Sequence, residues 1–163
     1  MSKDEIYRSG QDIEPFRFDE RVARVFPDML RRSIPGYAAS LEAIGSLASR
    51  YVRPNTRCYD LGCSLGAATL AMRQGIRQPG CHIVAVDNAA AMIERCRNIV
   101  AEEERRAASD TRIELALGDI RDTDISNASM VVLNYTLQFL GLDDRGPLLQ
   151  RIHDGLNDGG LLV

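Results

Sequence analysis

RCYDLGCSLGAATLAMRQ (Arg57–Gln74) is the stretch around which the rest of the chain is organised. It opens with a short apolar run that ends at Asp60-Leu61, turns through small residues and continues from Ala67 as a helix-forming series. In this order of strand, glycine loop and helix start, the small residues let the backbone approach a ligand. The helix N-terminus turns its unpaired N–H groups towards that ligand. The stretch therefore predicts a site for a nucleotide-like ligand.

Three functional interpretations compete for this loop. The residues Asp60, Gly62, Ser64 and Gly66 fit the D-x-G-x-G-x-G pattern of an S-adenosylmethionine site, with serine in place of the middle glycine. A dinucleotide fingerprint, G-x-G-x-x-G/A, would use Gly62, Ser64 and Ala67, and it also lacks the middle glycine that lets a pyrophosphate approach. The residues from Gly62 to Gly66 also spell G-x-S-x-G, the nucleophile elbow of serine hydrolases.

The surrounding sequence argues against the hydrolase. A nucleophile elbow follows several strands and is followed by an acid and then a histidine, whereas the residues before this loop have mostly helical patterns. The two histidines, His82 and His153, both lie downstream of the loop. His82 starts the next apolar run and His153 sits in a helical pattern, so we expect both to be solvent-facing or partly covered.

The composition indicates one ordinary domain. The chain has 163 residues, 45% of them hydrophobic and 26% charged, which is enough to bury one core. Its formal net charge of -3 gives no electrostatic reason to expect direct nucleic-acid binding. No signal peptide and no membrane-spanning run is recognisable, which predicts a cytoplasmic protein. Four cysteines without a C-x-x-C pair predict reduced, buried or partly buried thiols and no metal site.

The N-terminal third predicts an arm and two helical regions. Residues 1–17 are polar and without a firm period, so we expect a flexible arm. N-terminal helices are expected over 18–54, where a Pro35-Gly36 break separates a helix starting at Phe18 from a second one over Tyr37–Tyr51. We expect these helices to form a lid over the ligand site. Tyr37 is either a packing residue or an aromatic group that faces the ligand.

The remaining residues, 55–163, alternate strands and helices. Strands are expected over 57–61, 81–86, 112–117 and 129–133, with helices over 89–107 and 143–156. A turn at 157–160 precedes a last strand that starts at Leu161. This alternation predicts an α/β fold: a Rossmann-like parallel sheet with helices on both faces.

Polar residues follow four of these strands: Asp60, Asp87, Asp119 and Asn134. Ligands of parallel sheets bind at the carboxyl ends of the strands, so these residues predict one site. Asp87 follows the glycine loop by the roughly 20 residues expected of a ribose-binding carboxylate, although it could instead be the N-cap of the next helix. Asp119 with the Ile120 backbone can read an adenine edge, and Gly62 to Ser64 can hold a methionyl group. S-adenosylmethionine has no phosphate that would require the missing middle glycine, so Ser64 suits its site better than a dinucleotide site. We therefore favour S-adenosylmethionine over a dinucleotide.

The sequence also resembles the carboxy-S-adenosyl-L-methionine synthase family, whose members have the class I methyltransferase fold. The strings that carry this resemblance are FDERVARVFPDMLRRSIPGY (18–37), YDLGCSLGAATL (59–70), AVDNAAAMIERCR (85–97), GDIRD (118–122) and NASMVVLNYTLQFL (127–140). The first string weighs most, because ordinary methyltransferases share the glycine loop but lack this N-terminal segment.

The resemblance implies a reaction other than methyl transfer. Prephenate supplies a carboxyl group to the methyl carbon of S-adenosyl-L-methionine, and phenylpyruvate is released. A partner enzyme then uses the carboxy-S-adenosyl-L-methionine for the oxyacetyl group on wobble uridine of certain transfer RNAs. The sulfonium charge makes the methyl protons acidic, and the protein's part is to hold both substrates together, exclude water and stabilise charge. The resemblance also implies a homodimer. The net charge and the lack of a membrane-spanning run predict no direct contact with nucleic acid or membrane.

By motif match, nine residues take the family's contacts to S-adenosyl-L-methionine: Tyr37, Gly62, Cys63, Ser64, Asp87, Asn88, Asp119, Ile120 and Asn134. No general base is identified, and prephenate itself is a candidate for that role. This chain ends at Val163, within the expected fifth strand. Members of the resembled family continue beyond that strand. They continue through further helices and a closing antiparallel strand pair, and the arginine that resembles a clamp for the new carboxylate lies there. The C-terminal strands are therefore expected to be missing, which predicts an open, apolar sheet edge.

Two other classes of function stay open at this point. One is a methyltransferase that acts on a small molecule. The other is a non-catalytic module that binds S-adenosyl-L-methionine and leaves prephenate unchanged. A dinucleotide-dependent oxidoreductase is a weaker alternative, which binding of NAD in place of S-adenosyl-L-methionine would indicate.

Overall fold

The structure is a computed structural model that describes residues 29, 30 and 32–163. The expected arm over 1–17 and the start of the helix at Phe18 lie outside the described residues. Met29, Leu30, Arg32 and Ser33 are helical. The elements that follow are α2 (Tyr37–Tyr51), β1 (Arg57–Leu61), α3 (Ala67–Gly75), β2 (His82–Asp87), α4 (Ala90–Arg106), β3 (Arg112–Leu117), η1 (Ile120–Asp122), β4 (Ala128–Val132), η2 (Leu137–Phe139), α5 (Leu142–Gly155) and β5 (Leu156–Leu162).

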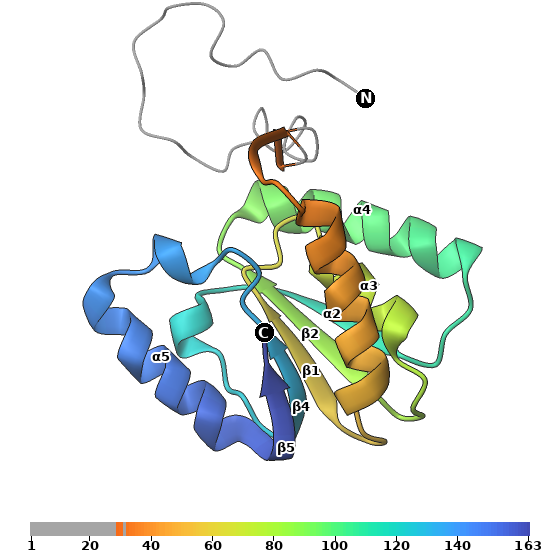
Figure 1. Ribbon diagram of the computed structural model, residues 1–163. Coiled ribbons are helices and arrows are strands. Elements are labelled where there is room, and N and C mark those ends of the chain that lie inside the picture. The colour runs from red at the N-terminus through yellow and green to blue at the C-terminus, as the bar shows by residue number, and fades with distance from the viewer. Residues whose placement is uncertain (1–28, 31) are drawn as a thin grey trace, which may run out of the picture.

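The five strands form one parallel sheet in the order β3-β2-β1-β4-β5 (Figure 1). Strand β1 lies at its centre between β2 and β4, and four of the five residues of β1 and all five of β4 are buried. Such strands are covered on both faces, which is why their sequences are nearly continuous apolar runs. The expected α/β architecture, a Rossmann-like sheet of the class I methyltransferase type, is confirmed.

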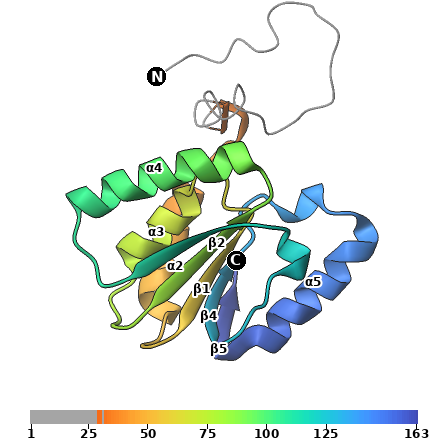
Figure 2. The same ribbon diagram turned by 180° about the vertical axis from the view of Figure 1, so that it is seen from behind.

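Helices cover both faces of the sheet, as Figures 1 and 2 show from opposite sides. On one face α2 and α3 pack through Ile44, Ala48 and Met72 against strand residues such as Ile83 and Met130. Helix α4 covers the same face near Ala85 through Ile93. On the other face α5 packs through Leu148 and Ile152 against Tyr59 and Val131. The alternation of side chains along each strand divides the apolar residues between these two cores.

The N-terminal helix α2 covers the sheet along most of its length. Its bounds agree with the expected 37–51, and Ile44 and Ala48 are buried against the sheet face. Only residues of its first turns, such as Tyr37 and Leu41, line the cavity at the carboxyl end of the sheet. Before α2, Met29, Leu30, Ser33 and Ile34 also line this cavity. The described part of the expected lid therefore consists of these residues at the cavity and of α2, which packs on the sheet with one end at the site.

The expected turn at 157–160 is wrong as a boundary, because these residues lie inside β5. Ala128 of β4 pairs with Leu156, and Met130 pairs with Leu161, so the segment between them is a bulge in the strand. Gly159 there has a φ of 74°, a conformation that favours glycine. Strand β5 is an edge of the sheet in the described residues, and Leu162 and Val163 are partly exposed on it.

Candidate functional site

The strand register brings the predicted polar residues into one row. Leu61 pairs with Val86, Asp60 with Val132 and Asp87 with Leu117. Continuing each strand by one or two residues places Gly62, Asp87, Gly118 and Asn134 side by side beyond the carboxyl end of the sheet. A cavity of about 680 Å³ opens there. This volume lies within the ~300–1,000 Å³ usual for small-molecule sites.

All nine residues predicted to contact the ligand line this cavity. They come from α2, the glycine loop, the ends of β2 and β3, and the segment after β4. Residues that the sequence analysis did not select also line it, and they include Arg121, Tyr135, Thr136, Phe139 and Asp144. The segments 118–122 and 127–140 of the resemblance contain four of these five, but nothing in those strings distinguishes them from their neighbours.

The glycine loop is held against β2 by its backbone. The N–H groups of Gly62 and Cys63 both donate to the carbonyl oxygen of Val86, at 2.8 and 2.9 Å. Gly62 has a φ of 84°, and a Cβ atom at this position would lie 2.4 Å from Thr136 Cγ2. Both the conformation and the close approach of the Thr136 side chain require glycine. The loop thus keeps a fixed shape at the floor of the cavity.

Asp87 is positioned by two backbone donors. Its Oδ2 accepts from the Ser64 N–H at 2.8 Å and its Oδ1 accepts from the Ala89 N–H at 2.9 Å. The N-cap of α4 is Ala89, with no side-chain cap, so the alternative of Asp87 as that N-cap is wrong. Each carboxylate oxygen keeps a lone pair for a further donor. A fixed carboxylate with two open acceptors suits the two hydroxyls of a ribose.

Asp60 is also at a strand end, but it is buried and only 1% exposed. Its Oδ2 accepts from Thr69 Oγ1 at 2.6 Å. Burial raises the pKa of Asp60 to about 6, and the hydrogen bond from Thr69 opposes this rise. Its main visible role is to hold β1 and α3 together beneath the loop.

Asp119 is paired with an arginine that the sequence analysis did not select. The guanidinium of Arg121 donates to both oxygens of Asp119 at 2.7–3.1 Å, and Arg121 Nη1 also donates to Asp144 Oδ2 at 3.0 Å. These hydrogen bonds from Arg121 hold the pKa of Asp119 below its usual range. They join η1 to the first turn of α5 at the cavity. Asp119 Oδ1 also accepts from the Arg121 backbone N–H at 2.9 Å, so the four contacts from Arg121 match the roughly four acceptor sites of a carboxylate.

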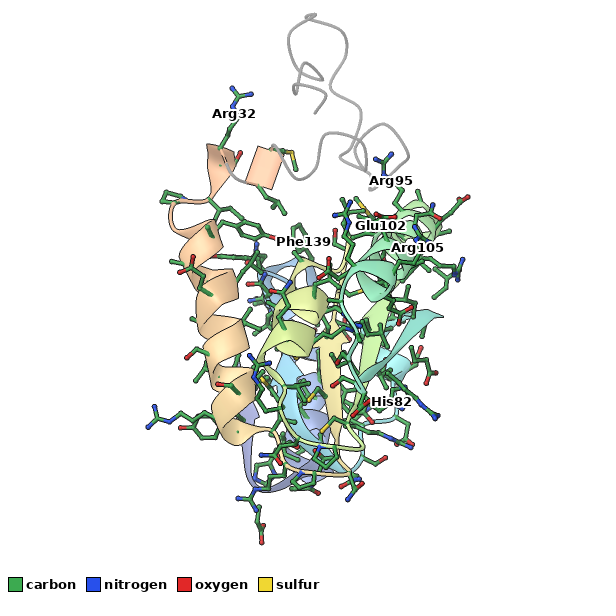
Figure 3. The ribbon with its side chains drawn as sticks, turned by 90° about the vertical axis from the view of Figure 1, so that its right-hand side faces the viewer. Arg32, His82, Arg95, Glu102, Arg105 and Phe139 are labelled. Carbon is green, nitrogen blue, oxygen red and sulfur yellow. The ribbon has the colours of Figure 1, made fainter. Side chains whose placement is uncertain are left out.

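Aromatic side chains line the cavity from two separate segments. The rings of Tyr37 and Tyr135 lie 6.2 Å apart, and the Tyr135 hydroxyl is 3.2 Å from Ser40 Oγ. Tyr135 has a φ of 57°, which is uncommon for a bulky residue and typical of functional segments. Phe139 is 65% exposed and lies at the upper end of the sheet (Figure 3). An apolar, ring-lined wall therefore stands beside the polar row.

The histidines do not support a hydrolase. His82 is the first residue of β2, at the end of the sheet opposite the glycine loop, and it faces Glu114 at 3.3 Å (Figure 3). The side chain of His153 on α5 is 82% exposed. The Ser64 hydroxyl contacts Met92 Sδ at 3.7 Å. Neither histidine is placed to activate Ser64, so the nucleophile-elbow interpretation fails.

All four cysteines are buried free thiols, as expected. Cys63 lies in the glycine loop, where a hydrogen bond with the Cys96 thiol and burial raise its pKa. In the described part of the chain, no group of three or more His, Cys, Asp or Glu side chains could hold a metal ion. No described helix is long and apolar enough to cross a membrane.

A family model described as a methyltransferase domain matches residues 59–160, which include the glycine loop and the strand ends. The chain belongs to this methyltransferase domain family. Among solved structures, a protein from Methanococcus maripaludis assigned as an S-adenosyl-L-methionine-dependent methyltransferase is similar with a TM-score of 0.65 and 21% identity. That comparison covers 94% of this chain and 66% of the other. A methyltransferase from Clostridium acetobutylicum gives a TM-score of 0.61 at 16% identity, over 87% and 55%. At these identities the likeness shows the fold alone.

Curated relatives are much closer in sequence. A carboxy-S-adenosyl-L-methionine synthase from Vibrio cholerae is 55% identical over 162 residues, which are 99% of this methyltransferase domain and 64% of the relative. One from Aliivibrio fischeri is 55% identical over 161 residues, 98% of this chain and 65% of the relative. The chain thus spans about 64–65% of the length of these relatives.

Proposed function

We propose that this protein makes carboxy-S-adenosyl-L-methionine from S-adenosyl-L-methionine and prephenate. The observation that carries the proposal is the 55% identity, along 99% of the chain, to a relative that bears the name of this synthase. The cavity also supports it, since the nine residues that the family resemblance selects line one space. The transfer-RNA modification that consumes the product, and a homodimeric assembly, belong to the same proposal.

In this proposal the carboxyl end of the sheet binds S-adenosyl-L-methionine. Asp87 accepts hydrogen bonds from the ribose hydroxyls, because its two backbone donors leave one acceptor site open on each oxygen. Asp119 and the Ile120 backbone lie at the adenine, and the backbone from Gly62 to Ser64 lies along the methionyl group. Cys63, Asn88, Asn134 and Tyr37 complete the contacts.

Prephenate would occupy the ring-lined part of the same cavity, beside Tyr37, Tyr135 and Phe139. The bond between its ring and its ring carboxyl breaks, the ring becomes aromatic as its hydroxyl leaves, and phenylpyruvate forms. The departing hydroxide takes one methyl proton and becomes water, while the methyl carbon forms a bond to the carboxyl carbon. The residues of this chain contribute by holding the two substrates close and excluding water. No described side chain has to act as the base.

A labelling experiment tests this proposal. The purified protein is incubated with S-adenosyl-L-methionine and prephenate carrying ¹³C in the ring carboxyl, and the products are identified by mass spectrometry. The expected result is carboxy-S-adenosyl-L-methionine with the added ¹³C, in equal amount to phenylpyruvate. Binding of S-adenosyl-L-methionine without this product would reject synthase activity for this chain and leave a binding module. Transfer of the methyl group from S-adenosyl-L-methionine to an added small molecule would instead indicate an ordinary methyltransferase.

A further inference from the structure

A second cavity, of about 470 Å³, lies at the other end of the sheet from the candidate site. Its walls are the C-terminal end of α3, the following residues 76–79 and the segment 107–111 between α4 and β3. It therefore sits near the amino ends of β2 and β3. None of its lining residues lines the larger cavity.

Arg73 of α3 lines this cavity and is only 5% exposed. Its Nη2 donates to the carbonyl oxygen of Ala107 at 2.8 Å, whereas its Nε is buried and has no hydrogen-bond partner among the described residues. No ion pair of Arg73 with a described carboxylate is present. A buried donor that lacks an acceptor destabilises the folded chain, and more so when the group is charged. An anion bound beside this buried guanidinium would supply the missing acceptor and balance its charge.

The protein itself compensates this charge only in part. Ala107 is the C-cap of α4, so Arg73 faces the negative end of that helix. A helix end carries about half an elementary charge, which leaves part of the guanidinium charge unbalanced. Arg77 adds a second cation to the cavity, and its guanidinium donates to the carbonyls of Gln74 and Ile76. Asp110 is the one carboxylate among the described residues that line the cavity, and it pairs with neither arginine.

Other polar side chains of the cavity can also donate hydrogen bonds. The Ser109 oxygen accepts from the Thr111 N–H at 3.2 Å, which leaves its hydroxyl hydrogen for another acceptor. The side-chain amide of Gln78 also lines the cavity. Two guanidinium groups, a hydroxyl and an amide form a set of donors that matches the several acceptor oxygens of a phosphate group.

We propose that this second cavity binds a phosphate group, either as inorganic phosphate or as part of a small phosphate monoester. Arg73 and Arg77 neutralise the dianion, and a small turn of the Arg73 side chain gives its Nε–H an acceptor. Asp110 limits the affinity through repulsion. The cavity volume leaves room for an organic group of modest size on the phosphate. This site is separate from the candidate site for S-adenosyl-L-methionine and does not depend on the function proposed there.

Nuclear magnetic resonance of the ¹⁵N-labelled protein tests the proposal directly. Inorganic phosphate is titrated at constant ionic strength with chloride as the balancing anion, and the Nε–Hε signal of Arg73 is followed. We expect a saturable shift of this signal, which chloride or acetate alone does not produce. Glycerol phosphate in a second titration separates the two sources: tighter binding than inorganic phosphate indicates a monoester, and weaker binding indicates the free ion.

Two exposed positions provide matched variants. Arg77→Gln removes one cation and should weaken phosphate binding about tenfold or more, since hydrogen bonds to charged groups are worth ~1.5–3 kcal/mol. Asp110→Asn removes the repelling carboxylate and should strengthen binding. A shift that does not saturate, a similar shift with acetate, or equal affinities of the wild type and Arg77→Gln would overturn the proposal.

Discussion

The two ends of the sheet treat charge in opposite ways. At the carboxyl end, the carboxylates of Asp60, Asp87 and Asp119 each have donors within the protein. At the amino end, Arg73 is buried, and within the described part of the chain it has one carbonyl acceptor and an unpaired Nε. At the carboxyl end, the positioned carboxylate of Asp87 can accept from a ligand rich in hydroxyl and amino groups. At the amino end, the Arg73 guanidinium needs an acceptor, which a ligand could supply. Internal hydrogen bonding thus indicates the kind of ligand that each end suits.

A similar contrast exists within the carboxyl end itself. Asp60 and Asp87 lie at the ends of neighbouring strands and both line the cavity. Asp60 is buried against Thr69, whereas Asp87 is held by two backbone N–H groups and keeps open acceptor sites. Two carboxylates at neighbouring strand ends therefore have different roles: Asp60 holds the fold together and Asp87 is available to a ligand. The variants below test this division, in order of expected effect.

Gly62→Ala should have the largest effect. The added Cβ would lie 2.4 Å from Thr136 Cγ2 at a φ of 84°, so overpacking and backbone strain add. We expect a loss of about 2–5 kcal/mol in the free energy of unfolding, measured by urea denaturation, together with loss of S-adenosyl-L-methionine binding. Gly36→Ala is the matched control, because Gly36 has a φ of 78° but no atom of the described residues lies within 4 Å of the added Cβ. Equal losses in the two variants would show that the contact with Thr136 is unimportant.

Asp60→Asn should stabilise the protein at neutral pH. The pKa of Asp60 is raised to about 6 from its model-peptide value of 3.8, so the folded chain holds a proton that the unfolded chain has released between these values. The free energy of unfolding of the wild type therefore falls as pH rises through this window, and the lost stability is largest above pH 6. Two pKa units correspond to about 3 kcal/mol as an upper limit.

Urea denaturation of the wild type and Asp60→Asn at pH 4 and pH 7.5 measures this effect. The advantage of the variant should grow with pH, and other titrating groups cancel in the difference between the two proteins. Asp110→Asn, at an exposed position, serves as the control. An advantage that stays constant or shrinks as the pH rises would contradict a raised pKa at Asp60.

Asp87→Asn should weaken S-adenosyl-L-methionine binding about 10–100-fold, with a smaller effect on folding. The amide nitrogen of asparagine would face the N–H of either Ser64 or Ala89, and one acceptor for the ribose would be lost. Calorimetric titration measures the change in affinity, and Asp110→Asn should bind like the wild type. Affinity within twofold of the wild type would remove Asp87 from the site.

Ser64→Ala should have the smallest effect, about twofold or less on binding and on product formation. Only the backbone N–H of Ser64 contacts Asp87, and alanine keeps this group. Its hydroxyl contacts Met92 Sδ, and no histidine lies at the loop. A complete loss of product in this variant, with folding intact, would mean that the hydroxyl takes part in the chemistry.

The sequence predicts the strands and the polar residues at their ends because both depend on local patterns. Apolar runs such as those of β1 and β4 are interrupted at the point where the chain leaves the sheet, so Asp60, Asp87 and Asn134 can be placed without coordinates. The ends of a strand are harder to predict where strand pairing overrides the local composition. The glycine-rich residues within β5 have the composition of a turn, yet pairing on both sides makes them a bulge.

Contacts between distant segments could not be predicted in this way. The pairing of Arg121 with Asp144 depends on how η1 meets α5, and the approach of Thr136 to Gly62 depends on the path after β4. Likewise, the missing partner of Arg73 becomes visible only once the end of α4 is placed beside α3. In sequence, Arg73 is an ordinary helix residue with no motif around it.

Calorimetric titration of S-adenosyl-L-methionine into the wild type, Asp87→Asn and Arg77→Gln tests the central claim most directly, with NAD as a comparison ligand. The account predicts one binding site per chain, tenfold or greater weakening in Asp87→Asn, unchanged affinity in Arg77→Gln and no binding of NAD. Absence of S-adenosyl-L-methionine binding to the folded wild type, or weakening by Arg77→Gln but not by Asp87→Asn, would contradict the placement of this site at the carboxyl end of the sheet.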